Sequence, residues 1–272
     1  MSQFPVSIAP ATPGDIESLV DISVRSFKED KNTQFKENAY GSGWFRDCMM
    51  GVTRDYINNM EDPTPGRVRL TVLKAVDESS GRIIGHVTWG EQGLEEVSRE
   101  ALGTRETGIS VRETGKRDTP KDETTTGRSN ETPPQSTAKL GVAELEKLTS
   151  NHMNSFVQRI MPKGARCMFI CQIAVHPEFQ GRGIGKTLIR WGTRKADEHE
   201  VICWVHLSEA GWSVFEKLGW QMEDSLSVDL DEYADNIPVP DGEDRWGSYT
   251  FRCAVRQPGL ETWYKLVWLH SG

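Results

Sequence analysis

The stretch CMFICQIAVHPEFQGRGIGKTLIRWG, which starts at Cys167, constrains the fold more than any other part of the sequence. Residues 167–175 are apolar at both alternating positions, which is typical of a central strand covered on both faces. The chain then turns at Pro177, and closely spaced glycines lead into a helical pattern over residues 183–199. A buried strand that passes through a glycine-rich turn into a helix predicts a mixed α/β domain.

Apolar periodicity elsewhere predicts further strands and helices around this strand. A short strand begins near Val6, a hairpin turns at Asp77–Gly81, and VICWVHL forms a second buried strand over residues 201–207. The other expected elements are helices over 15–27, 42–60, 142–161 and 210–219 and strands over 225–230 and 248–256. Hairpin and strand order together indicate a partly antiparallel sheet.

One long segment lacks the composition of a folded core. From Arg112 to Lys139 the only apolar non-proline side chain is Ala138. Such a segment cannot bury enough surface to offset an ordering entropy of roughly 1–2 kcal/mol per residue. We therefore expect a single domain over residues 1–272, interrupted by a disordered low-complexity insertion at 93–140 and ended by an aromatic tail at 256–272.

Charge and cysteine content exclude several classes of function. The net charge of −8 argues against a nucleic-acid or anionic-membrane partner, since both need a basic face. No secretory signal is evident, and the longest apolar stretch is far short of the ~20 residues of a membrane helix. The 5 cysteines show no metal-ligand spacing. We expect a cytoplasmic protein with reduced cysteines and no metal.

The glycine-rich segment QGRGIGKT does not fit either common nucleotide motif. A P-loop needs a glycine where this chain has Gln180, and the dinucleotide fingerprint needs one at Lys186. Glycines at alternating positions still leave several backbone N–H groups free to converge on one anion at a helix N-terminus. The segment therefore predicts a pyrophosphate site, with a glycine-rich turn that binds nothing as the alternative.

Two motifs resemble the GNAT superfamily of N-acetyltransferases, in its fungal form. AVHPEFQGRGIGKTLIRWG is similar to the family's acetyl-CoA signature, Q/R-x-x-G-x-G/A after a strand, with Gln180, Gly183 and Gly185 at the matching positions. Downstream, LSEAGWSVFEKLGW resembles the family's short helix before a "YxKxGF"-like turn. The resemblance covers most of residues 5–90 and 140–255. It implies a mixed, partly antiparallel central sheet with splayed central strands and flanking helices.

The resemblance also implies where acetyl-CoA, the cosubstrate, would bind. Its pantetheine arm would lie between the strands 167–175 and 201–207, and an amide near Ala174 or Val175 would donate to the thioester carbonyl. The residues implied in cofactor binding are Ile173, Ala174, Val175, Gln180, Gly181, Arg182, Gly183, Ile184, Gly185, Lys186 and Ser208.

Direct attack by a primary amine needs a group that accepts the amine's proton. His206 is the leading candidate, because it is the polar side chain at the end of VICWVHL and an imidazole suits the task. Fungal relatives carry a glutamate at this place, so a histidine bonded to neighbouring backbone is the alternative. Glu91 is a second candidate, with a solvated loop carboxylate as its alternative. Ser208 could supply a proton through water or act only as a helix N-cap.

A second departure from the family concerns the general acid. The usual tyrosine of the short helix is Phe215 here, so this chain is either a slower acetyltransferase or a weakly catalytic acyl-CoA sensor. A nucleotide-binding protein is a third possibility. Trp44, Trp89 and Trp212 could line a pocket for an apolar amine, or belong to the core. The acceptor, a small-molecule or peptide amine, stays open, and the resemblance makes a homodimer unsurprising.

Overall fold

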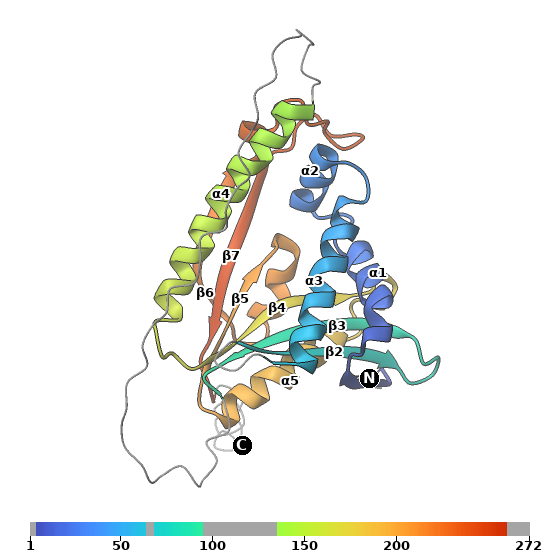
Figure 1. Cartoon of the computed structure of the whole chain (residues 1–272), viewed down its shortest axis with the longest axis vertical. Helices are drawn as coiled ribbons and strands as arrows, with labels where there is room; N and C mark the ends of the chain where they lie inside the picture. Colours follow the sequence, from blue (N-terminus) through green and yellow to red (C-terminus); the bar gives the residue numbers. More distant parts are fainter. Residues whose placement is uncertain (1–3, 64–67, 95–134, 260–272) are drawn as a thin grey trace, which may run out of the picture. The chain divides into compact units, whose positions relative to one another are not determined.

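The computed structural model describes residues 4–63, 68–94 and 135–259 (Figure 1). The described residues all belong to one compact unit. The predicted insertion at 93–140 lies mostly outside the described residues, but its last part does not, because helix α4 begins at Gln135. The aromatic tail at 256–272 is described only as far as residue 259.

Seven strands form one sheet in the order β1-β2-β3-β4-β5-β7-β6. The strands are β1 (Val6–Pro10), β2 (Arg69–Asp77), β3 (Ile83–Gln92), β4 (Cys167–Val175), β5 (Ile202–Leu207), β6 (Gln221–Asp229) and β7 (Ser248–Arg256). Every neighbouring pair is antiparallel except β4 and β5, which run parallel. The predicted mixed α/β class with a partly antiparallel sheet is confirmed.

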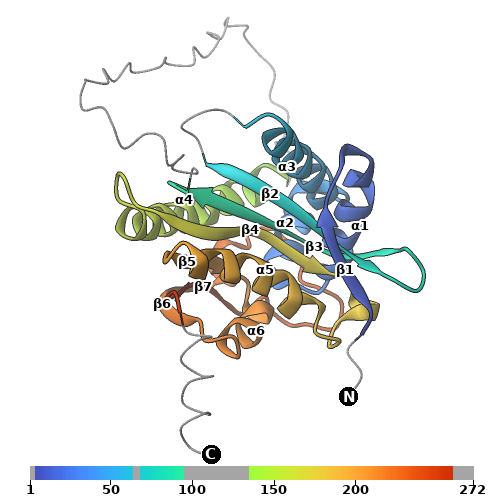
Figure 2. The same cartoon turned by 90° about the horizontal axis from the view of Figure 1, so that it is seen from below.

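Helices cover both faces of this sheet. They are α1 (Ile16–Ser26), α2 (Lys31–Tyr40), α3 (Trp44–Glu61), α4 (Gln135–Ile160), α5 (Ile184–Glu198) and α6 (Trp212–Glu216). Figure 2 shows α1, α3 and α4 on one face and α5 with α6 on the other. The parallel connection from β4 to β5 runs through α5, as a crossover between parallel strands requires.

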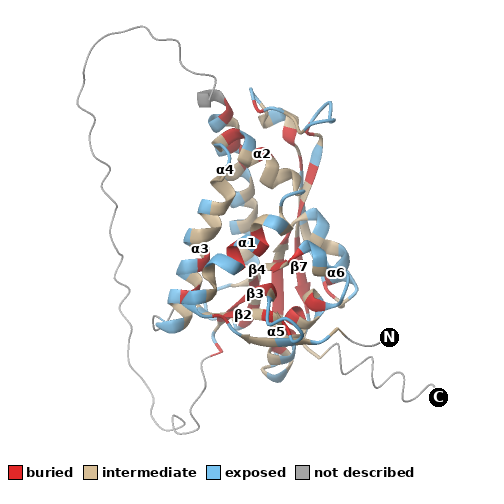
Figure 3. Ribbon diagram, turned by 90° about the vertical axis from the view of Figure 1, so that its right-hand side faces the viewer, coloured by how far each residue is buried: buried red, intermediate tan, exposed pale blue. Residues whose placement is uncertain are grey.

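The main hydrophobic core lies between the sheet and α5. Trp89 of β3 is fully buried there, and its indole Nε1 donates to the backbone oxygen of Leu188 at 3.3 Å. Gly192 of α5 lies against this ring so closely that an added Cβ would lie 2.1 Å from the indole. A separate cluster joins α2 and α4 to the far ends of β6 and β7, around Phe35 and Trp246. Figure 3 shows the buried residues concentrated along the strands.

Helix α2 was not predicted, because its sequence KNTQFKENAY looks like a polar connection. Only Phe35 and Ala39 are buried, so the apolar face is too narrow to produce a clear period. Asp30 begins the helix as its N-cap and accepts a hydrogen bond from the Thr33 backbone N–H. The start of this helix, residues 30–33, contributes to the wall of the candidate site.

Candidate functional site

The two parallel strands part halfway along their length. Their ladder runs from the pair Cys167–Ile202 to the pair Ile170–Val205 and ends there. Beyond it, β4 continues to pair with β3, and β5 continues to pair with β7. The gap expected between these strands is therefore present, and it begins after Ile170 and Val205.

Two residues of β4 direct their backbone into this gap. The His176 N–H donates to the Ile84 oxygen at 2.9 Å, so alternation places Ala174 in hydrogen-bonded register with β3 and turns Ile173 and Val175 the other way. The Val175 oxygen accepts instead from Ser26 Oγ at 2.6 Å and from Gln180 Nε2 at 3.0 Å. The backbone of Ala174, included in the predicted set, therefore belongs to the ladder with β3.

The glycine-rich turn leads from the end of β4 into α5. Gly181 and Gly183 have φ of 74° and 84°, a left-handed conformation that side chains with a Cβ rarely adopt. Gly183 is the N-cap of α5, and a Cβ on either glycine would meet open space. The first N–H groups of this 15-residue helix and its macrodipole face the turn. The turn therefore has the geometry that an anion such as a pyrophosphate needs.

Basic side chains flank the turn. Lys186 is exposed on the first turn of α5. The Arg182 guanidinium lies 5.1 Å from the ring centroids of both Phe4 and Phe179, and it donates to the Glu178 oxygen at 3.1 Å. Both residues can contribute positive charge near the turn, although the structure anchors Arg182 on the two rings.

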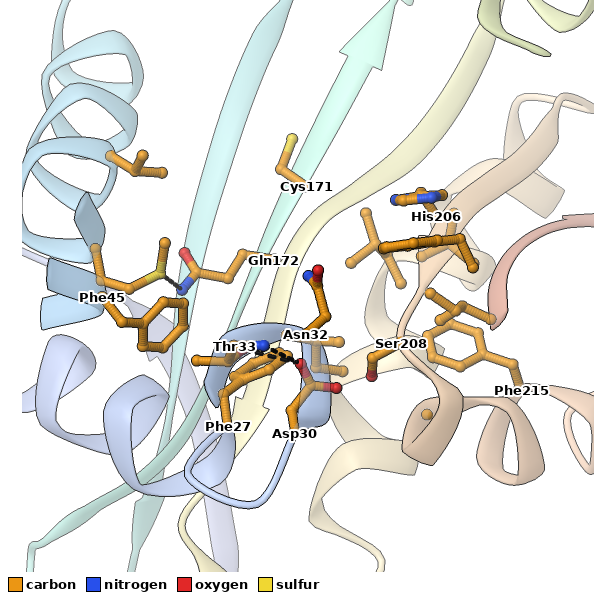
Figure 4. A pocket seen from close by; sticks show the side chains of 18 of the residues that line it. Phe27, Asp30, Asn32, Thr33, Phe45, Cys171, Gln172, His206, Ser208 and Phe215 are labelled. Atoms are coloured by element: carbon orange, nitrogen blue, oxygen red, sulfur yellow. Dashed lines mark hydrogen bonds between the residues drawn. The ribbon is translucent and has the colours of Figure 1, made fainter. Parts of the chain in front are cut away.

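A cavity of about 440 Å³ opens where β4 and β5 part (Figure 4). Its walls include residues 170–173 of β4 and residues 205–208 at the end of β5. Aromatic side chains from four other parts of the chain complete it: Phe27, Phe45, Tyr56, Phe215, Tyr249 and Phe251. A cavity of this size and lining suits a small organic molecule or the reactive end of a longer one.

His206 lies in the wall of this cavity as a neutral imidazole. Its ring stacks on Phe251 with centroids 5.8 Å apart and an interplanar angle of 5°. Burial, and next the nearby His152, lower the pKa of His206 to about 4. Its Nε2 atom is buried without a hydrogen-bond partner among the described residues. A neutral imidazole with an unpartnered nitrogen can accept a proton, although a low pKa makes it a weak base.

His206 belongs to a row of side chains that crosses the sheet. Cys253 of β7 pairs with His206 on one side and with Asp224 of β6 on the other, so all three point to the same face. From α4, which covers that face, His152 Nε2 lies 3.2 Å from Asp224 Oδ1. Arg159 also donates to Asp224, at 2.6 Å. The row thus leads from the cavity to titratable groups at the edge of the sheet.

The segment that forms these features matches a known protein family. The profile of the acetyltransferase (GNAT) family matches residues 140–220, which contain the two parallel strands, the glycine-rich turn and α6. Residues 140–220 of this chain therefore resemble the GNAT family. The resemblance of the two sequence motifs to the GNAT superfamily is confirmed, and its fungal form stays a prediction.

Solved structures of N-acetyltransferases share the fold of this chain. A mosquito arylalkylamine N-acetyltransferase like 5b is 14% identical with a TM-score of 0.52, and the match covers 93% of this chain and 99% of that one. An agmatine N-acetyltransferase in its apo form is 13% identical with a TM-score of 0.51, over 93% and 99% of the two chains. At these identities the likeness concerns the fold. No curated protein sequence matches this chain.

Ser208 and Phe215 both line the cavity, as their places in the motif imply. Ser208 occupies the N-cap position of the short 3-10 helix Glu209–Gly211, but its side chain makes no capping bond. Phe215 is buried and packs edge-on against Trp220, with ring centroids 5.1 Å apart. No hydroxyl stands at position 215, so a thiolate leaving group would find no phenol there.

Glu91 is not the solvated loop carboxylate that the sequence indicated. It lies within β3 and is buried, and Lys195 Nζ of α5 lies 2.7 Å from both of its carboxylate oxygens. Thr71 Oγ1 donates to the same carboxylate at 3.2 Å. The side chain therefore faces α5 and does not line the cavity, so the structure does not bring Glu91 together with His206.

The three predicted pocket tryptophans also lie elsewhere. Trp89 and Trp212 pack in or against the core next to α5, and Trp44 stacks on Tyr40 with centroids 5.1 Å apart. None of them lines the cavity. The alternative reading of these residues, as packing residues, is the correct one for Trp89.

Sequence reasoning missed several residues of the wall. Asp30 and Asn32 come from the start of α2, Gln172 from β4, and Tyr249 from β7. Gln172 Nε2 donates to Ser23 Oγ at 2.9 Å, and Ser23 Oγ lies 2.9 Å from His86 Nε2. The one available signal was polarity, because Gln172 is the only non-apolar side chain in CMFICQIAV apart from its cysteines.

Neither a metal site nor a membrane span emerges from the part of the chain that the structure describes. No three His, Cys, Asp or Glu side chains there are grouped to hold a metal ion. No helix there combines the length and apolar character needed to cross a membrane. All 5 cysteines are unpaired.

Proposed function

We propose that this chain is an acetyl-CoA-dependent N-acetyltransferase that transfers an acetyl group to a primary amine by direct attack. The observation that carries the proposal is the end of the β4–β5 ladder at Ile170 and Val205, directly at a cavity with unpaired polar groups. A parallel pair that opens in this way leaves room and backbone partners for an extended chain such as a pantetheine arm.

The cosubstrate would lie along three features of the domain. The backbone of Ile173 and the N–H of Val175 would face the arm, since the Val175 oxygen already accepts from Ser26 and Gln180. Ser208 would border the arm at the end of β5. The Gln180–Lys186 amides at the start of α5 would hold the pyrophosphate, with Arg182 and Lys186 adding charge. Acetyl-CoA would supply an acyl thioester, whose carbonyl needs a preorganised donor such as the Val175 amide.

The amine must lose a proton before it can attack. An alkyl ammonium has a pKa near 10.4, so its deprotonation at pH 7 costs roughly 4–5 kcal/mol. His206 is the proposed acceptor, because the residue lines the cavity, its buried Nε2 has no hydrogen-bond partner among the described residues, and the ring is neutral. The thiolate would leave without a proton from position 215, which a thiol pKa of ~8.5 allows at a reduced rate.

The second candidate function is an acyl-CoA-binding protein with little or no turnover. Two observations favour it: Phe215 offers no proton, and burial lowers the pKa of His206 to about 4, which makes it a weak base. Both candidates use the same binding site. Only a rate measurement separates them.

The test combines ligand binding and turnover on the purified chain. Thermal unfolding with acetyl-CoA, free CoA, or ATP and magnesium should give a higher midpoint with the two CoA compounds alone, since a ligand at 100 times its Kd stabilises by about 2.7 kcal/mol. Free thiol released from acetyl-CoA in the presence of amines would establish the enzyme. Binding without thiol release would establish the sensor, and a response to ATP alone would contradict both.

The homodimer and the cytoplasmic location expected from the sequence form part of this proposal. Sedimentation of the purified chain and fractionation of cells that express it would test them separately.

A further inference from the structure

We propose that the acceptor is a primary amine with one positive charge on an aromatic or other apolar body, without a carboxylate, and that Asp30 selects it. This inference rests on the proposed N-acetyltransferase function and adds the substrate class. Among the described residues, the wall of the cavity combines one carboxylate, two residues with an unpartnered acceptor atom and a set of aromatic rings.

Asp30 is the only Asp, Glu, Lys or Arg among the described residues that line the cavity. Its hydrogen-bond donors are neutral: the N–H and hydroxyl of Thr33, both at 2.9 Å, and the Tyr249 hydroxyl at 2.8 Å. The cavity therefore carries a negative charge that no cation in its wall balances. A carboxylate in such a setting favours a cationic ligand and disfavours an anionic one.

The structure holds this carboxylate in place. Asp30 is the N-cap of α2, where the helix dipole favours a negative charge. Burial, and then the proximity of Asp30, raise the pKa of Tyr249 well above its ordinary value, so the phenol remains a fixed donor to Asp30. Tyr249 is for the same reason a poor source of a proton for the thiolate.

Two further acceptors in the wall lack donors. Asn32 Oδ1 and His206 Nε2 are both buried without a hydrogen-bond partner among the described residues. Figure 4 shows Asp30 and Asn32, from the start of α2, on the opposite side of the cavity from His206 and Phe215. An ammonium group has three N–H donors and no acceptor, so it matches a wall that offers acceptors.

The rest of the wall suits an apolar body. Phe27, Phe45, Tyr56 and Phe251 supply rings, and Met49 and Val52 supply aliphatic surface. An amino acid would bring a carboxylate next to Asp30, with no Lys or Arg among the described lining residues to pair with it. A second ammonium on the ligand would likewise meet no second carboxylate there. The wall therefore favours a monoamine over both amino acids and polyamines.

Asp30 acts on binding and not on the chemical step. A carboxylate that stabilises the ammonium form does not help the amine to lose its proton. The first proton must pass to His206 Nε2, after which the amine nitrogen bonds to the acetyl carbon. The C–S bond then breaks with its electron pair leaving on sulfur, and the second proton of the nitrogen passes to the thiolate through solvent, which leaves the amide and free thiol. Removal of the Asp30 charge should therefore raise KM for the amine and leave kcat unchanged.

The test measures binding by calorimetry in the presence of free CoA, so that no turnover is needed. The probes are 2-phenylethylamine, its uncharged analogue 2-phenylethanol, phenylalanine, and 1,4-diaminobutane. We expect 2-phenylethylamine to bind at least ten-fold more tightly than each of the other three. Equal binding of the alcohol, of phenylalanine or of the diamine would overturn the inference, and this comparison needs no variant.

The variant Asp30→Asn removes the charge but keeps a good N-cap residue. It should weaken 2-phenylethylamine binding at least ten-fold while 2-phenylethanol is unaffected. Glu29→Gln is the matched control, since it removes the same charge one residue away on an exposed side chain outside the cavity wall. Equal effects of the two variants, or no effect of Asp30→Asn, would contradict the role of Asp30.

The same measurements separate this inference from the proposed function. If 2-phenylethylamine binds with the expected selectivity but no thiol is released from acetyl-CoA, the inferred amine site is supported and the proposed N-acetyltransferase function is contradicted. If other amines release thiol from acetyl-CoA while 2-phenylethylamine fails to bind, the proposed N-acetyltransferase function is supported and the inferred substrate class is wrong.

Discussion

The β4–β5 pair has two halves that differ in structure. In the first, here called the closed half, the two strands are hydrogen-bonded to each other; in the second, the open half, they part and border the cavity. In the first half, Cys167–Ile170 pairs with Ile202–Val205, and every side chain in the two segments is apolar. In the second half the ladder is absent, and the first polar side chains, Gln172 and His206, appear at the cavity. In the closed half, strand pairing and side-chain packing thus build the core. In the open half the two strands do not pair with each other, which leaves backbone and side-chain polar groups next to the cavity.

The closed half should be the most sensitive to added volume. Gly90 of β3 lies under the Phe169 ring, which stacks on Trp204 at 4.7 Å, and an added Cβ would lie 2.4 Å from the ring. Because the stacked ring cannot move aside freely, Gly90→Ala should lower the free energy of unfolding by about 2–3 kcal/mol. Chemical denaturation measures this change.

Gly185→Ala is the control for the open half. Its Cβ would meet Val175 at an ordinary 3.7 Å, and alanine favours the helix, so stability should stay within about 1 kcal/mol of the wild type. Equal losses in the two variants would mean that the halves do not differ in packing.

The open half should be the more sensitive to loss of a polar group. His206→Ala should lower turnover at least ten-fold, because a general base contributes that much or more, while acetyl-CoA affinity stays the same. Steady-state thiol release and a binding titration measure the two quantities. Unchanged turnover would remove His206 from the mechanism.

The pH dependence sharpens this prediction. Since the pKa of His206 is lowered to about 4, the ring stays neutral as the pH falls from about 8 to about 6, and it should cause no loss of rate in that range. In the unfolded chain the His206 imidazole has its ordinary pKa of about 6.5, so the unfolded chain binds a proton more readily than the folded one. Stability should therefore fall as the pH drops from about 6.5 towards 4, and less so in His206→Ala.

The glycine-rich turn before α5 should differ from the β2–β3 turn in how a strained backbone affects ligand binding. Gly183→Val places a side chain at a φ of 84° at the N-cap of α5, so the turn must shift. We expect acetyl-CoA affinity to fall about five- to ten-fold, as a strain of about 1 kcal/mol implies. Gly81→Val is the matched control, because Gly81 has a φ of 69° and open space in the β2–β3 turn, away from the cavity. Gly81→Val should lower the free energy of unfolding and leave acetyl-CoA affinity unchanged.

The smallest effect is expected at the position of the missing tyrosine. Phe215→Tyr restores a hydroxyl in the cavity wall, next to a packed Trp220. Turnover should rise by no more than about three-fold, because a thiolate of pKa ~8.5 already leaves without a proton. A much larger rise, together with a new limb in the pH–rate profile, would show that protonation of the thiolate limits the wild type.

Local patterns were enough to predict the strands, the glycine-rich turn and the position of His206. CMFICQIAV and VICWVHL are apolar runs of strand length, and the glycines mark the helix start that follows. These features arise from neighbours in sequence, which a period or a motif records.

The remaining wall residues could not be predicted because distant segments bring them together. Asp30 meets Tyr249 across 219 positions, and Lys195 meets Glu91 across 104. Neither pair has a local signal, since a strand tyrosine and a helix lysine look like ordinary surface residues. The register of β7 against β5 and the position of α2 decide these contacts, and both depend on packing of the whole domain.

The central claim is that the open half of the β4–β5 pair binds the acyl-CoA arm through the backbone of β4. Amide hydrogen exchange, resolved by residue with and without acetyl-CoA, tests it most directly. We predict that the ligand slows exchange at Ile173 and Val175 and leaves Ala174, already in register with β3, unchanged. Bound acetyl-CoA with no change at Ile173 and Val175 would contradict this account.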